Sequence, residues 1–103
     1  MNVCKKLSEQ KVFVLSKQLL RSGTAVGALI REAEHSESKK DFIHKLSISL
    51  KEANETEYWL ELLVNTDYLS ESEFKNIRIK IGEFNSLLIA IIKTSKDNLR
   101  RNN

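Results

Sequence analysis

The stretch from Phe42 to Val64 constrains the fold most, because it predicts one long helix with apolar residues on two sides. Several of its apolar side chains share one broad arc of the helical period. They are Phe42, Ile43, Leu46, Leu50, Ala53, Leu60 and Val64. A second patch lies well round from this arc and consists of Ile48, Trp59, Leu62 and Leu63. A surface helix needs only one stripe, so the second patch predicts a second partner, either another helix of the chain or a neighbouring subunit. Because the chain is short, the subunit is favoured, and these four residues are candidates for an oligomer interface.

A carboxylate falls inside the main stripe, where Glu57 projects between Ala53 and Leu60. A lone buried carboxylate is costly, so it is expected to find a cation or to take up a proton. Arg21 and Arg31 of the preceding helical stretch are the candidates for this cation. A structural ion pair is a better interpretation than a catalytic acid, since nothing else at this position indicates chemistry.

The rest of the composition also favours long helices in a single domain of residues 1–103. Proline is absent and glycine occurs only three times in 103 residues, which argues against a loop-rich β fold. The longest apolar run, from Leu87 to Ile92, is too short to span a bilayer. The first residues lack the apolar stretch of a secretory signal, and the single cysteine, Cys4, excludes an intrachain disulfide. We therefore expect a cytoplasmic protein without a membrane partner.

Four helical segments are expected along the chain, at about 2–8, 11–35, 39–65 and 71–100. The first is short, and Ser8, Glu9 and Gln10 provide a polar connection to the second. Within the second segment two alternatives are open. Either residues 22–24 break the helix, or the glycines Gly23 and Gly27, four residues apart, allow another backbone to come close. Because the apolar phase continues through both glycines, one continuous helix is favoured.

The last two helices have clear start signals. Ser38 with Asp41 and Ser70 with Glu73 resemble capping boxes. The last helix alternates spacings of three and four along one apolar seam, which is typical of coiled-coil-like packing. The seam comprises Phe74, Ile77, Ile81, Phe84, Leu88, Ile91 and Ser95, and Ile92 and Leu99 widen it. Ile79 and Ile89 fall outside it and add to the case for an intermolecular contact. Together these segments predict an all-α, antiparallel up-down bundle.

Basic residues gather at the end of the last helix, although the net charge is only +3. Lys93, Lys96, Arg100 and Arg101 face Asp97 alone between positions 93 and 101. Cations near a helix C-terminus complement the macrodipole, which is the simpler explanation. The alternative is that they contact nucleic-acid phosphates. On that interpretation the full candidate set is Arg21, Arg31, Lys39, Lys40, Lys93, Lys96, Arg100 and Arg101.

No catalytic, cofactor or metal site is expected. His35 and His44 are nine residues apart, Cys4 is remote from both, and no HExxH motif exists. Glu32 with His35 and Asp41 with His44 have the Glu-x-x-His spacing of di-iron bundles, but a paired set of inward glutamates is not evident. Because no cluster fits an active site, an enzyme acting on a small molecule is disfavoured.

Several motifs along 13–69 fit together. They are Gln18 with Arg21, the small residues 22–24, Ile30 with Glu32, and the run KEANETEYW from Lys51 to Trp59. In these the chain resembles the four-helix-bundle family encoded by intervening sequences of bacterial large-subunit ribosomal RNA genes, often labelled "S23 ribosomal protein". The chain departs from the family at Leu29, where asparagine is usual. A complete first helix also usually precedes the position of Val3, so the first helix is expected to be short or truncated.

The resemblance implies a left-handed antiparallel four-helix bundle that assembles as a ring of five identical copies. A related accessory protein of diversity-generating retroelements binds nucleic acid and a reverse transcriptase, whereas the role of the intervening-sequence proteins is unknown. Two functions are therefore expected. The first is a non-enzymatic, self-associating bundle that binds RNA, DNA or a ribonucleoprotein through basic surfaces. The second is a purely structural module for protein partners, with Trp59 and Ile48 at the interface.

Overall fold

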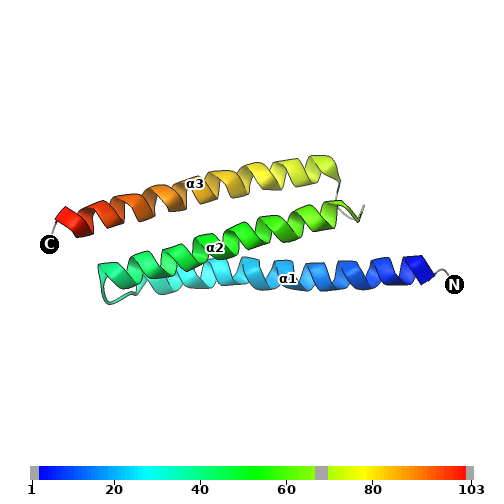
Figure 1. Ribbon diagram of the computed structural model, residues 1–103, viewed down its shortest axis with the longest axis horizontal. Coiled ribbons are helices and arrows are strands. Elements are labelled where there is room, and N and C mark those ends of the chain that lie inside the picture. Colours follow the sequence, from blue (N-terminus) through cyan, green and yellow to red (C-terminus); the bar gives the residue numbers. More distant parts are fainter. Residues whose placement is uncertain (1–2, 67–69, 102–103) are drawn as a thin grey trace.

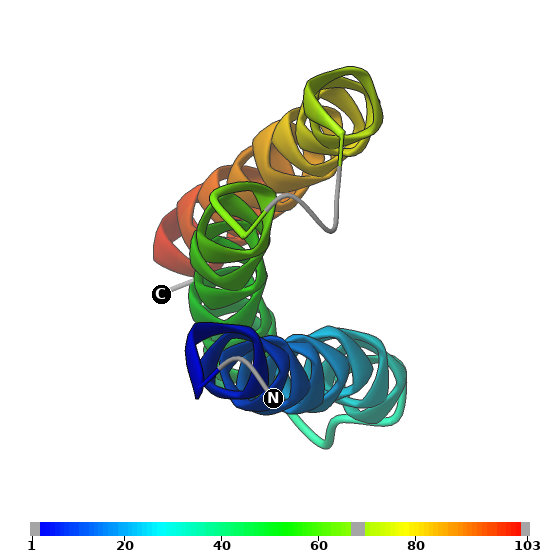
Figure 2. The ribbon, with the colours of Figure 1, turned by 90° about the vertical axis from the view of Figure 1, so that its right-hand side faces the viewer.

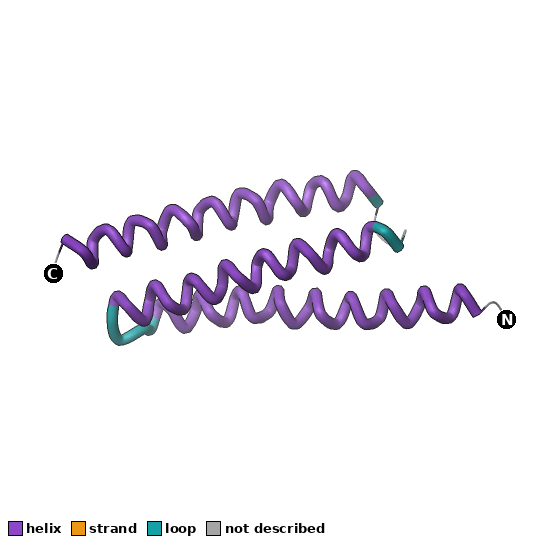
Figure 3. The backbone as a smooth tube through the Cα atoms, viewed as in Figure 1, coloured by secondary structure: helices purple, strands orange, loops and turns teal. Residues whose placement is uncertain are grey.

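The computed structural model describes residues 3–66 and 70–101, with side chains from residue 9 onward. Within these ranges the chain forms three α-helices and no strand (Figures 1 and 3). They are α1 from Val3 to Glu34, α2 from Lys39 to Val64 and α3 from Glu71 to Arg101. Consecutive helices run antiparallel. The predicted all-α class is confirmed, whereas a fourth helix is not found in the described part of the chain.

Capping serines start the second and third helices. The hydroxyl of Ser38 accepts the backbone N–H of Asp41 at 3.1 Å, and the hydroxyl of Ser70 accepts that of Glu73 at 3.2 Å. Each bond satisfies one of the backbone donors that a helix start leaves free. Asn65 ends α2 and Thr66 follows it, while the predicted turn formers at 67–68 lie outside the described residues. Both predicted capping boxes therefore start helices as expected.

The first helix differs from the prediction. Residues 8–10 do not interrupt it, because α1 is continuous from Val3 to Glu34, so the separate short helix at 2–8 is wrong. Glutamate and glutamine are strong helix formers, and a polar segment without glycine or proline has no reason to end a helix. The predicted continuity through Gly23 and Gly27 is confirmed. The side chain of Cys4 lies outside the described residues.

The helices form a layer with α2 in the middle. α1 packs on one side of α2 and α3 on another, and no described Cα of α1 comes within 8 Å of one in α3. Seen end-on, the three helices do not close round a shared axis (Figure 2). The molecule measures 66 × 24 × 15 Å, and its radius of gyration is 17.3 Å, against about 13 Å for a compact domain of this length. α2 therefore uses two of its sides for packing within one chain, one against α1 and the other against α3.

The core that all three helices share lies at one end of the molecule. It is a cluster of five buried residues: Ala33 of α1, Ile43 and Leu46 of α2, and Leu88 and Ile92 of α3. Phe42, Leu50 and Phe84 pack against this cluster. The C-terminal end of α1, the N-terminal end of α2 and the C-terminal half of α3 are thus held together here. Leu15, Leu60 and Leu63 are buried towards the other end, where α1 and α2 pack as a pair.

Candidate interaction surfaces

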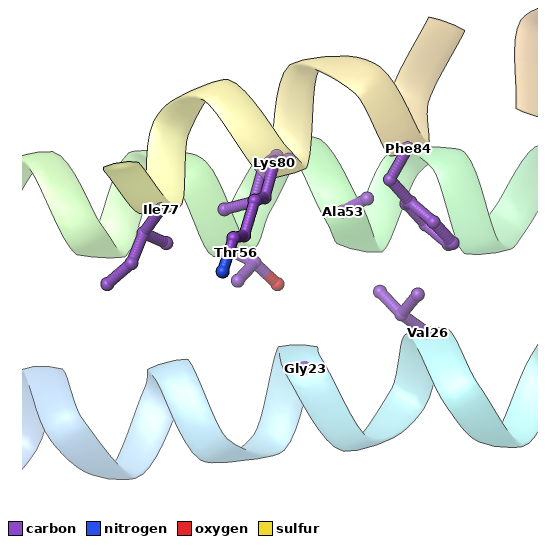
Figure 4. A pocket seen from close by; sticks show the side chains of 8 residues that line it. Gly23, Val26, Ala53, Thr56, Ile77, Lys80 and Phe84 are labelled. Carbon is purple, nitrogen blue, oxygen red and sulfur yellow. The ribbon is translucent and has the colours of Figure 1, made fainter. Parts of the chain in front are cut away.

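An apolar cavity of about 270 Å³ lies between α1 and α3, with α2 as its floor (Figure 4). Its apolar lining comes from Gly23 and Val26 of α1, Ala53 and Thr56 of α2, and Ile77 and Phe84 of α3. Lys80 is the charged residue among its lining. A shallower hollow continues it past Ser16, Leu20 and Leu60. We call the cavity and the hollow together the open groove. It is a concave apolar surface that no described part of the chain covers.

The α1 wall of the open groove is built from small residues. A Cβ atom on Gly23 or Gly27 would meet no neighbouring atom within 4 Å. A glycine inside a helix costs about 1 kcal/mol relative to alanine. Packing within the chain therefore gives no reason for glycine at either position. Leu20 stands beside them with 72% of its surface exposed.

The α3 wall carries the large residues Ile77, Lys80 and Phe84. Leu87 and Ile91 continue the same side of the helix beyond the groove, at spacings of three and four. Leu87 is 59% exposed and Ile91 is 36% exposed. Leu88 of the predicted seam and Ile92, which was predicted to widen it, are buried, whereas Ile91 lies at the exposed edge of that seam.

A second apolar stripe runs along α3 on the side away from the open groove. It consists of Ile79, Gly82, Ser86 and Ile89, again at spacings of three and four, and all four are exposed. We call it the outer stripe. Ile79 is 51% exposed and Ile89 is 53% exposed, and a Cβ on Gly82 would meet nothing within 4 Å. The prediction that these isoleucines lie outside the packed seam is therefore confirmed.

Buried hydroxyls fix how α1 lies on α2. Ser49 is fully buried and its hydroxyl donates to the carbonyl of Val26 at 3.1 Å. Ser22 is also fully buried, with its hydroxyl 2.8 Å from that of Thr56. Because an unpaired buried hydroxyl is costly, these bonds favour one register of the two helices. Serine at both positions also lets the two backbones come close.

Arg21 is the centre of a charged cluster across α1 and α2. Its guanidinium donates to the carboxylates of Glu52, at 3.4 Å, and of Glu55. The side-chain oxygen of Gln18 accepts a further bond from it at 2.9 Å. Glu55 also accepts the indole N–H of Trp59 at 3.2 Å. With two carboxylates on it, Arg21 is a poor candidate for phosphate contacts.

Glu57 is paired, but not with a residue of α1. Its carboxylate lies 3.5 Å from the guanidinium of Arg78 in α3, on a partly exposed flank of α2. The predicted pair with Arg21 or Arg31 is therefore wrong. Glu57 was predicted inside the main stripe, but it lies on a partly exposed flank of α2, and the helical period does not tell which neighbouring helix passes there.

The second patch of α2 lies along its α1 side. Leu63 is buried within the chain, whereas Ile48, Trp59 and Leu62 are half-buried. Trp59 packs edge to face on exposed Tyr58, with ring centroids 5.1 Å apart. Much of this patch is thus covered by the chain itself, and the larger exposed aliphatic surfaces lie on α1 and α3.

The sequence analysis did not predict the open groove. The pattern that could have indicated it is the run of spacings of three and four from Ile77 to Ile91.

The basic end of α3 forms a surface of its own. Lys93, Lys96 and Arg100 line one hollow of about 310 Å³ together with Asp97 and apolar residues. None of the three cations forms an ion pair with another described residue. They are therefore available to an anion, and Arg101 follows them as the last residue of α3.

The remaining predicted cations are distributed differently. Arg31 lines a mixed-charge hollow at the joint of α1 and α2 with His35 and Asp41. In the same hollow Lys45 pairs with Glu32 at 3.2 Å. Lys39 and Lys40 are exposed at the start of α2. These residues lie at the same end of the molecule as the basic end of α3 (Figure 1), but on separate elements.

The described residues hold no cluster of three or more metal-binding side chains. None of the described helices has the combined length and apolar character that crossing a bilayer requires.

The family of 23S rRNA-intervening sequence proteins matches the chain over residues 1–90. A solved structure from Bacteroides thetaiotaomicron VPI-5482 is described as a protein with unknown function from the S23 ribosomal protein family. It is 61% identical to this chain, with a TM-score of 0.77, and the match covers 82% of this chain and 76% of that one. No curated protein matches. The resemblance read from the sequence is thereby confirmed.

Proposed function

The chain belongs to the family of 23S rRNA-intervening sequence proteins, and from that premise we propose a non-enzymatic helical protein that works by associating with copies of itself. The observation that carries this proposal is the exposed area, 7548 Å² for a chain of 11.9 kDa. A folded monomer of this mass exposes about 6,000 Å². The surplus, about 1,500 Å² on one chain, is roughly what a chain buries in two standard interfaces, each of which covers about 800 Å² per partner.

The character of the surplus supports association. Leu20, Leu87, Ile79 and Ile89 are each more than half exposed, and monomeric proteins seldom leave contiguous apolar surface of this kind uncovered. The resemblance implies a four-helix arrangement, and the open groove is the side on which a further helix would pack. The resemblance also implies a ring of five copies, and the half-buried Trp59 remains a candidate for a further contact.

The subunit count tests the proposal. Native mass spectrometry and sedimentation velocity on the wild-type chain are expected to show an assembly of several copies of the 11.9-kDa chain. Trp59→Ala, measured alongside, tests whether the second patch of α2 contributes. A wild-type chain that stays monomeric at every concentration up to the millimolar range would contradict self-association.

A second candidate function is binding of nucleic acid, and the basic end of α3 favours it. Lys93, Lys96 and Arg100 share one hollow without ion-pair partners. Contacts between these cations and phosphates need no base recognition. Each phosphate that a cation neutralises releases counterions, so the affinity falls as the salt concentration rises. In an oligomer the same three residues would repeat once per copy and form a denser basic surface. Such a role fits a cytoplasmic protein.

A mobility shift at two salt concentrations tests this candidate. Three or four phosphate contacts predict an affinity for duplex DNA that falls roughly 40- to 150-fold between 50 and 200 mM salt. Lys96→Glu is expected to weaken binding, whereas Lys75→Glu, near the other end of α3, serves as the control of equal charge. No shift even at 50 mM salt would leave a purely structural or protein-partner module.

A further inference from the structure

The hollow at the basic end of α3 has an apolar floor, which contact with anions alone does not explain. The floor consists of Leu50 of α2 and of Ile89 and Ile92 of α3. Ile92 belongs to the core cluster and Leu50 packs against that cluster, so the fold fixes both side chains in place. Ile89 stands at the edge of the floor and is 53% exposed. We call this floor, together with the cations around it, the basic hollow.

The rim of the basic hollow is positively charged. Lys93, Lys96 and Arg100 are exposed, and none of them forms an ion pair with another described residue. Asp97 also lines the hollow, so three cations stand against one carboxylate. The cations follow spacings of three and four, which places them on one side of α3 over about 10 Å of its axis. The rim therefore suits a partner that carries several anionic groups.

The floor favours a protein segment over a nucleic acid as this partner. A phosphodiester backbone offers charge to the rim, but only its bases could cover an apolar floor, and unstacked bases are commonly held on aromatic side chains. None of the residues that line the basic hollow is aromatic. An aliphatic side chain, in contrast, gains free energy by leaving water for an aliphatic floor.

An unpaired hydrogen-bond acceptor lies beside the floor. Asn85 precedes Ile89 by one turn of α3, and its Nδ2 donates to Oδ1 of Asn54 in α2 at 3.2 Å. The Oδ1 atom of Asn85 is buried and accepts no hydrogen bond from the described residues. A buried acceptor without a donor is costly. A peptide has N–H groups that could reach such an acceptor, whereas a phosphodiester backbone has none.

We propose that the basic hollow binds an acidic segment of another protein, with an aliphatic side chain on the floor and carboxylates paired with the three cations of the rim. Arg100 can hold one of these carboxylates through two parallel hydrogen bonds. The inference goes beyond self-association and does not depend on the number of copies, because every residue of the hollow belongs to one chain. It uses the same cations as the nucleic-acid candidate and differs from it by giving the apolar floor a role.

Three labelled probes of equal negative charge test the inference by fluorescence anisotropy. The first is a peptide of glutamates and leucines, the second has serine in place of each leucine, and the third is a single-stranded DNA. We expect the leucine peptide to bind the wild-type chain at least about tenfold more tightly than the serine peptide, because one leucine side chain is buried on the floor.

Two variants separate the floor from the rim. Ile89→Ser is expected to weaken binding of the leucine peptide by about fivefold or more and to leave the serine peptide unchanged. Lys96→Glu is expected to weaken both peptides. Ile79→Ser is the matched control, because Ile79 is 51% exposed on the same helix but does not line the hollow. Since both isoleucines are exposed, circular dichroism should show the wild-type helix content in each serine variant.

Several results would overturn the inference. They are absence of binding by the leucine peptide, equal affinities of the leucine and serine peptides, and equal effects of Ile89→Ser and Ile79→Ser. DNA that binds more tightly than either peptide, and that responds to Lys96→Glu but not to Ile89→Ser, would assign the hollow to nucleic acid instead. A wild-type chain that stays monomeric would contradict self-association and leave this inference standing.

Discussion

Two neighbouring leucines of α3 provide the sharpest test of how the chain folds. Leu88 is 3% exposed and belongs to the core cluster shared by all three helices, whereas its neighbour Leu87 is 59% exposed. Leu88→Ala removes buried carbons and leaves a cavity, which costs about 3 kcal/mol of unfolding free energy. Leu87→Ala removes the same atoms from water-exposed surface and should cost less than about 1 kcal/mol. Helix propensity changes equally in both.

Urea unfolding followed by circular dichroism measures the difference. With a slope of about 1.5 kcal/mol/M for a chain of this size, Leu88→Ala should lower the midpoint by about 2 M and Leu87→Ala by less than about 0.7 M. The measurement belongs at concentrations where the chain is monomeric, since association would add its own stabilisation. Equal midpoint shifts for the two variants would refute the rotation of α3 that buries Leu88.

Three further predictions concern the helix contacts and caps. Ser49→Ala loses its hydrogen bond to Val26 without leaving a donor unpaired, so it should lower the unfolding free energy by only about 1 kcal/mol. Ser49→Leu should push α1 away from α2 and lower the unfolding free energy by more than about 2 kcal/mol. The urea midpoints of the two variants measure the difference. Ser38→Ala removes the cap of α2 and should cost about 1 kcal/mol in thermal unfolding, with Ser38→Gly costing only a few tenths. Arg78→Ala breaks a partly exposed pair with Glu57 and should change the unfolding free energy by less than about 0.5 kcal/mol; a loss above 2 kcal/mol would show that this carboxylate is buried.

Much of the fold follows from local signals in the sequence. Hydroxyls at Ser38 and Ser70 specify helix starts through bonds made within four residues, so they can be recognised without knowing the neighbours. The helix through Gly23 follows from the unbroken apolar phase on both sides of it. The predicted segments 39–65 and 71–100 agree with the ends of α2 and α3 to within one residue.

The errors concern what the sequence does not encode locally. Residues 8–10 were read as a connection because they are polar, although polar residues continue a helix as well as end one. The partner of Glu57 depends on where α3 crosses α2, and how deeply Ile91 and Ile92 of the predicted seam are buried depends on how α3 is turned towards its neighbours. These are tertiary quantities, and period counting does not determine them. The open groove is of the same kind, because it exists only where α1 and α3 diverge.

The two-sided middle helix has a different explanation from the one that its sequence favours. α2 needs two apolar sides because α1 and α3 lie on different sides of it, so its second patch is largely used within the chain. The uncovered surface is instead on the flanking helices, each of which has one neighbour where a closed bundle would give it two. The shared core at one end holds the layer together, while the groove and the outer stripe remain free. Assembly would thus complete the packing of α1 and α3, and the same contacts that join the copies should stabilise each fold.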